Sequence, residues 1–187
     1  MVLRLLVATF LSWTLTACIS SPMQAPDPMS QSSAVSVATP DFLTSPDTAL
    51  RWYSDLIWID DPEGRYERRA DMLQQALQHE FEHKGYSFVK PGEIADYDVL
   101  AVAVLGDING HQKVEQVFRM YPSLGTPARG YKRGTVLVAL APTGTKTIVW
   151  RGALEVFTDP GMQPIQVREH RIQHGAVQLL RSIPNYK

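Results

Sequence analysis

Residues 99–105 constrain the fold of this 187-residue chain more than any other segment. The run VLAVAVL is apolar throughout and has no polar residue at alternate positions. A strand with one face in water would alternate, so this run predicts a strand that is covered on both faces. Helices can cover one face of such a sheet. A loop, the first strand, a second copy of the chain or a partner must then cover the other.

Two segments flanking this run have the periodicity of amphipathic helices. The first begins between residues 62 and 66 and reaches Lys84, and Gly85 follows it as the expected left-handed C-terminal residue. The second runs from about Gln163 to Ser182, where Pro184 stops it. Their apolar stripes consist of Ala70, Leu73, Leu77 and Phe81 in the first helix, and of Ile172, Ala176, Leu179, Leu180 and Ile183 in the second.

Several further strands are expected around the apolar run. Short apolar runs bounded by turn residues predict a first strand ended by an Asp-Asp-Pro turn, a brief second strand, a less distinct strand and a hairpin. In that order these segments are residues 52–59, 86–89, 114–121, and 134–140 with 147–157.

The second strand of the hairpin alternates clearly. Trp150 and Leu154 point one way, whereas Arg151 and Glu155 point the other. We expect Trp150 to be buried between the sheet and the helices, and Gly152 on the same face to let a helix approach closely. Together these elements predict an α+β fold, with a mostly antiparallel sheet of about five to six strands packed against two helices.

The chain is expected to have three parts. Residues 1–17 carry a basic tip at Arg4 and an apolar run over 5–11 that is too short to span a bilayer, which is typical of a signal peptide. Residues 18–48 are rich in Ser, Pro, Gln, Met and Ala without a lasting period, and predict a flexible tether. Residues 49–187 are long enough for a single domain with its own core.

Cys18, the only cysteine, ends the segment LTAC. This segment resembles the lipobox of bacterial lipoproteins, which implies cleavage before Cys18 and lipid on its thiol and amine. Ile19 and Ser20 stand where an Asp would direct retention in the inner membrane, so the resemblance implies an outer-membrane lipoprotein that faces the periplasm. Several acyl chains, at roughly 0.8 kcal/mol per buried methylene, would hold it there through Cys18.

Four motifs follow the first helix in a fixed order and precede the last helix: KGY at 84–86, DYDVL at 96–100, GTVLV at 134–138 and VWRGA at 149–153. This order resembles a known family of bacterial lipoproteins, domain of unknown function 4136 (DUF4136). The similarity covers residues 50–184 and implies a single-domain envelope lipoprotein without an established activity or catalytic residues. The chain departs from the family at Ala141 and Pro142, where an Asp is usual.

The segment HEFEH at 79–83 matches the H-E-x-x-H pattern, in which two histidines hold zinc and the glutamate activates water. With Leu77 toward the core, His79 lies about 200° and His83 about 240° round the helix, so both should point to solvent. We therefore expect no metal, no cofactor and no enzymatic activity. The alternative is a zinc-dependent hydrolase that uses His79, Glu80 and His83.

Charge indicates the kind of partner. A formal net charge of -1 gives no general attraction to nucleic acid. Arg129, Lys132 and Arg133 concentrate positive charge in one segment, and Arg151 should point away from the helices. We expect these four residues to contact an envelope protein or an anionic envelope component. The sequence therefore predicts a non-enzymatic module for binding, or for envelope assembly and maintenance.

Overall fold

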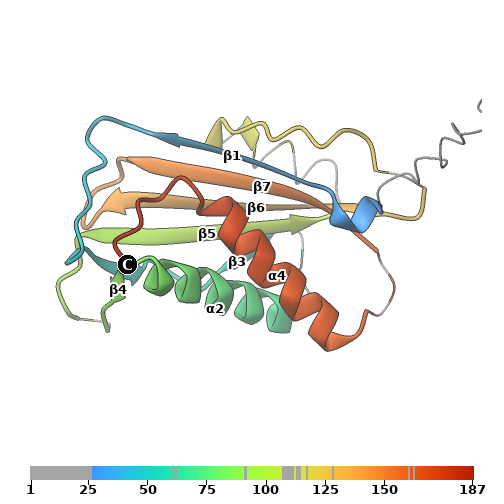
Figure 1. Ribbon diagram of the computed structural model, residues 1–187, viewed down its shortest axis with the longest axis horizontal. Coiled ribbons are helices and arrows are strands. Elements are labelled where there is room, and N and C mark those ends of the chain that lie inside the picture. The colour runs from blue at the N-terminus through green and yellow to red at the C-terminus, as the bar shows by residue number, and fades with distance from the viewer. Residues whose placement is uncertain are drawn as a thin grey trace, which may run out of the picture.

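The computed structural model describes residues 27–187 except 60, 62, 91, 107–111, 113–114, 117, 128, 160 and 162. In the residues described, two long helices lie on one face of a seven-stranded sheet, which confirms the α+β class (Figure 1). In chain order the elements are η1 (Pro28–Ser30), β1 (Ser32–Ala38), β2 (Ala49–Trp52), β3 (Ile57–Ile59), α2 (Glu67–His83), β4 (Ser87–Phe88), β5 (Tyr97–Leu105), β6 (Lys132–Pro142), β7 (Trp150–Thr158) and α4 (Ile165–Leu179).

The sheet is mixed. The strands β1, β7, β6 and β5 pair successively as antiparallel neighbours, and β6 with β7 forms the predicted hairpin. By contrast, β2 and β3 both pair in parallel with β5, and β4 pairs in parallel with β2. The single strand expected over residues 52–59 is thus two short strands, beside the first and second halves of β5. They run parallel to β4 and β5 because α2 carries the chain back along the sheet before the next strand begins.

The strand β1 lies where the sequence predicts a tether. All seven of its residues pair with β7, from Ser32 opposite Val156 to Ala38 opposite Trp150. Its small side chains are mostly exposed, so hydrophobic pattern gives little signal, and backbone hydrogen bonds to β7 hold it in place. The flexible tether expected over 18–48 is therefore wrong from residue 32 onward. The signal peptide, Cys18 and the first residues of the tether lie outside the described residues.

The helix-covered face holds the larger core. Trp150 is 1% exposed, and its indole Nε1 donates to Ser182 Oγ at 3.2 Å. A Cβ atom at Gly152 would lie 2.6 Å from Trp150 Cη2 and 3.1 Å from Leu179 Cδ1. The burial of Trp150 and the close approach of a helix over Gly152 are therefore confirmed. Around them pack Leu77, Phe81, Val99, Val138, Leu140, Ala176, Leu180 and Ile183.

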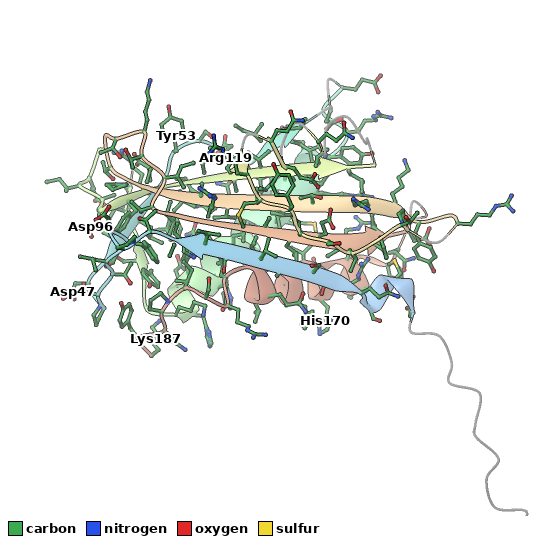
Figure 2. The ribbon with its side chains drawn as sticks, turned by 90° about the horizontal axis from the view of Figure 1, so that it is seen from above. Asp47, Tyr53, Asp96, Arg119, His170 and Lys187 are labelled. Carbon is green, nitrogen blue, oxygen red and sulfur yellow. The ribbon has the colours of Figure 1, made fainter. Side chains whose placement is uncertain are left out.

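The segment after β5 covers the other face. Phe118 and Met120 are 7% and 2% exposed, and Arg119 between them has a φ of 49°. In Figure 2, Arg119 lies on the opposite side of the sheet from His170 of α4. Residues 115–116 and 118 are helical, so the strand predicted over 114–121 is wrong, whereas coverage of both faces is confirmed. Phe118 and Met120 pack against Val102, Val104, Leu137, Ala139 and Ala153.

Candidate functional site

An open cleft of about 150 Å³ lies between the sheet and the first halves of α2 and α4. Side chains from β5, β6 and β7 form its floor, and side chains from the two helices form its walls. Most of the lining is apolar, because the same stripes that build the core continue into it. The apolar lining comes mainly from Leu73, Ala103, Val136, Leu154, Val156 and Ile172.

Glycines keep the cleft open. A Cβ atom at Gly134 on β6 would lie 3.5 Å from Val156 Cγ2 and 3.6 Å from Leu105 Cδ1, which is ordinary contact distance. A larger side chain at this position would therefore extend into the cleft. Gly175 on α4 lies closer to the sheet, since its Cβ atom would stand 3.0 Å from Leu154 Cδ2.

Three half-buried arginines line the cleft, Arg69 from α2 and Arg168 and Arg171 from α4. The Arg69 guanidinium lies over the ring of Tyr66, 5.3 Å from its centroid. Arg168 Nη2 donates to the carbonyl oxygen of Gln163 at 3.1 Å. Among the described residues, no ion pair joins any of these arginines to a carboxylate. An apolar cavity with unpaired guanidinium groups suits a ligand that is apolar along its length and anionic at one end.

Arg171 joins this cleft to the start of the described chain. Its Nη2 donates to the carbonyl oxygen of Phe157 at 2.6 Å, and its Nη1 donates to Met29 Sδ at 3.5 Å. Burial lowers the pKa of Arg171 from its ordinary value, while the nearby charge of Asp27 raises it. Because the ordinary value is so high, the guanidinium stays protonated at neutral pH.

None of the four basic residues singled out in the sequence lines the cleft. Arg129 and Lys132 are exposed. Arg133 instead turns onto the sheet, where its Nη1 lies 3.4 Å from Glu155 Oε1. Arg151 is half-buried on the face away from the helices, as predicted, and its Nε has no hydrogen-bond partner in the described part of the chain. Their proposed contact with a partner stays a prediction.

Glu155 is a residue whose role sequence reasoning missed. Alternation placed it correctly on the face away from the helices, but it is 0% exposed there. Its Oε2 accepts a hydrogen bond from the backbone N–H of Leu124 at 3.0 Å. Burial raises the pKa of Glu155, whereas the Leu124 N–H and the charge of Arg133 lower it. The carboxylate thus fastens the covering segment to the sheet, and strand periodicity carries no signal for that contact.

The H-E-x-x-H segment does not form a walled site. His79 and His83 are both exposed, as their positions on the helix predict. Glu80 is 8% exposed and lies 3.9 Å from Lys84 Nζ, which also donates to the carbonyl oxygen of Ile183 at 3.2 Å. Glu80 therefore helps to fix the end of α2 against the C-terminal segment. In the residues described, no three His, Cys, Asp or Glu side chains gather as they would around a metal ion.

No protein-family model matches this chain, and no curated protein matches it. Solved structures with a similar arrangement include the PelC dodecamer of Paraburkholderia phytofirmans, with 9% identity and a TM-score of 0.46 over 80% of this chain and 98% of that one. A DUF4136 family protein from Bacteroides thetaiotaomicron, the family that the sequence motifs resemble, has 12% identity and a TM-score of 0.42 over 79% and 95%. A DUF330 protein from Xanthomonas campestris has 10% identity and a TM-score of 0.41 over 75% and 83%. None of the helices in the described residues is long and apolar enough to cross a membrane.

Proposed function

We propose that this protein is an outer-membrane lipoprotein, anchored by lipid on Cys18, whose periplasmic domain is a non-enzymatic binding module. The observation that carries the binding role is the apolar cleft beneath α2 and α4, with arginines on its walls. Binding sites for small molecules are commonly concave, mostly apolar and equipped with a few placed polar groups. Of the two kinds of partner expected from the sequence, this cleft favours an anionic envelope component over an envelope protein.

The anchor is tested through the single cysteine. In cells given labelled palmitate, the natural protein should incorporate label and sediment with the outer membrane. Cys18→Ser should carry no label and should be absent from that fraction, because the acyl acceptor is missing. Unchanged labelling of Cys18→Ser would overturn the lipoprotein assignment.

The cleft is tested with a neutral, environment-sensitive naphthylamine dye added to the purified full chain in non-ionic detergent. The fluorescence should rise and saturate as the dye enters the apolar cavity. Gly134→Val should abolish the saturable signal, since the added side chain projects into the cleft from an ordinary strand position. Ala38→Val, at an exposed strand position outside the cleft, serves as the matched control and should bind like the natural protein. Equal binding by all three proteins would show that the cleft is not the site.

A further inference from the structure

The described chain begins beside the cleft. Met29, in η1, accepts hydrogen bonds at its Sδ from the backbone N–H of Asp159 at 3.1 Å and from Arg171 at 3.5 Å. Asp159 and Arg171 both line the cleft, so η1 is fixed against its wall. Asp27 caps this turn, because its Oδ1 accepts the backbone N–H of Met29 at 2.9 Å. The segment that leads to the anchor therefore leaves the domain next to the cleft.

This placement limits how far the cleft can lie from the membrane. Cys18 precedes Asp27 by nine residues. Even fully extended, at about 3.3–3.6 Å per residue, such a segment spans only about 30 Å. With lipid on Cys18, the cleft therefore stays within roughly one bilayer thickness of the membrane surface.

The three arginines differ in how many guanidinium N–H groups remain available to a ligand. Arg171 is engaged by Phe157 and by Met29 of η1. Arg168 donates to one backbone carbonyl oxygen, and Arg69 lies against an aromatic ring, so both retain N–H groups that can bind a ligand. Guanidinium groups bind phosphate through paired, charge-assisted hydrogen bonds.

We infer that the cleft takes up an acyl chain of an anionic phospholipid from the membrane that holds the anchor, with the lipid phosphate on Arg69 and Arg168. The inference rests on the proposed anchor and on the proposed binding role of the cleft. The apolar lining matches the chain, the arginines match the phosphate, and the short connection through η1 keeps both beside the bilayer. The proposed ligand is a membrane phospholipid and not a free fatty acid.

The test uses the lipidated full chain in phosphatidylcholine vesicles that contain a trace of photoreactive lipid. The probe is phosphatidylglycerol with a diazirine in one acyl chain. The comparison is diacylglycerol with the same chain, which lacks the phosphate. After illumination, mass spectrometry of peptides locates the crosslinks. Crosslinks from phosphatidylglycerol should fall on cleft residues such as Leu73, Val136 and Ile172, and those from diacylglycerol should be about tenfold fewer.

Matched variants distinguish the contribution of the arginine charges from that of the apolar cavity. Arg69→Gln with Arg168→Gln should reduce phosphatidylglycerol labelling to the diacylglycerol level, because the phosphate loses its partners. Arg181→Gln removes the same charge from an exposed residue just beyond α4 and should leave labelling unchanged. Gly134→Val should abolish cleft labelling by both lipids. Circular dichroism and thermal unfolding of each variant verify that the fold is intact.

Three results would overturn the inference. Equal labelling by the two lipids would remove the role of the arginines, while leaving the cleft as a binding site. Labelling by a photoreactive fatty acid but not by phosphatidylglycerol would exclude the membrane phospholipid. Absence of cleft labelling, together with saturable dye binding and an acylated Cys18, would end the lipid inference while the proposed function stands.

Discussion

The two faces of the sheet are covered in different ways. Two amphipathic helices cover one face, and an irregular segment covers the other. The helices leave an open cleft at the end of the sheet where η1 lies, whereas Phe118 and Met120 seal the opposite face with little exposure. An amphipathic helix packs on a sheet only through its apolar stripe. Space therefore remains where that stripe no longer lies on the sheet. An irregular chain can follow the sheet surface more closely. The cleft therefore lies on the face that the two helices cover.

The largest expected change in stability concerns Trp150, in the well-packed part of the helix-covered face. Trp150→Ala should lower the free energy of unfolding by about 3–5 kcal/mol, because truncating a large buried side chain leaves a cavity. The neighbouring Arg151→Ala should lower it much less, since Arg151 lies half-buried on the opposite face. Urea titration of both variants measures the difference. Similar losses would contradict the assignment of these residues to opposite faces.

Two glycines on the helix-covered face should respond differently to the same methyl group. Gly152→Ala should lower the free energy of unfolding by about 1–3 kcal/mol, because the new Cβ overlaps the Trp150 ring. Gly134→Ala should leave stability unchanged or raise it by up to about 1 kcal/mol, since its Cβ meets only ordinary contacts. Thermal and urea unfolding provide the comparison. A large loss for Gly134→Ala would mean that this part of the face is already filled.

The face covered by the irregular segment should show a pH dependence centred on Glu155. Burial raises the pKa of Glu155 in the folded state above its ordinary value of 4.5. The folded state then keeps a proton that the unfolded chain has released, so this contribution to stability is present below the ordinary pKa and is lost as pH rises through the raised pKa.

Glu155→Gln cannot ionise and has no such loss. Its free energy of unfolding relative to the natural protein should therefore increase as pH rises above 4.5. Urea titrations across this pH range measure the difference. A difference that stays constant with pH would show that burial does not govern this carboxylate.

The smallest effect is expected on the solvent side of α2. Replacing His79 and His83 together with Gln should change the free energy of unfolding by no more than about 0.5 kcal/mol, as is usual for exposed positions. Zinc titration should give the same unfolding curve for both proteins, because neither exposed imidazole has a third protein ligand near it in the described residues. Tight zinc binding that disappears in the double variant would contradict this view of the helix.

Sequence periodicity predicted the regular face well. The stripes through Leu77 and Phe81 and through Leu179 located both helices, and the alternation around Trp150 oriented β7 correctly. The irregular face was harder to predict, because the contact of Phe118 with the sheet depends on the path of the chain and not on a repeat. The strand β1 was missed for a related reason, since its stability comes from pairing with β7 and its own side chains are small.

The candidate site was predicted less well than the fold. The arginines noted in the sequence lie just before β6, at its start and on β7, whereas those in the cleft stand on α2 and α4. Only the packing of the two helices brings Arg69, Arg168 and Arg171 to the lining of one cleft. A glycine in an apolar strand, such as Gly134, is noticeable in the sequence. The cavity above it depends on how α4 lies across the sheet. The cleft depends on how the two helices pack on the sheet. Local sequence patterns do not reveal that packing.

The position of β1 has a mechanical consequence. Figure 1 shows η1 and the C-terminal end at opposite ends of the long axis, and Lys187 lies against the end of α2 through its bond to the carbonyl oxygen of Glu82. A load applied between the anchor and the C-terminal end would pull β1 along its own axis. All hydrogen bonds between β1 and β7 would then bear the load together in shear, instead of opening one at a time. If Cys18 carries lipid as proposed, the edge strand would resist force between that anchor and the rest of the domain.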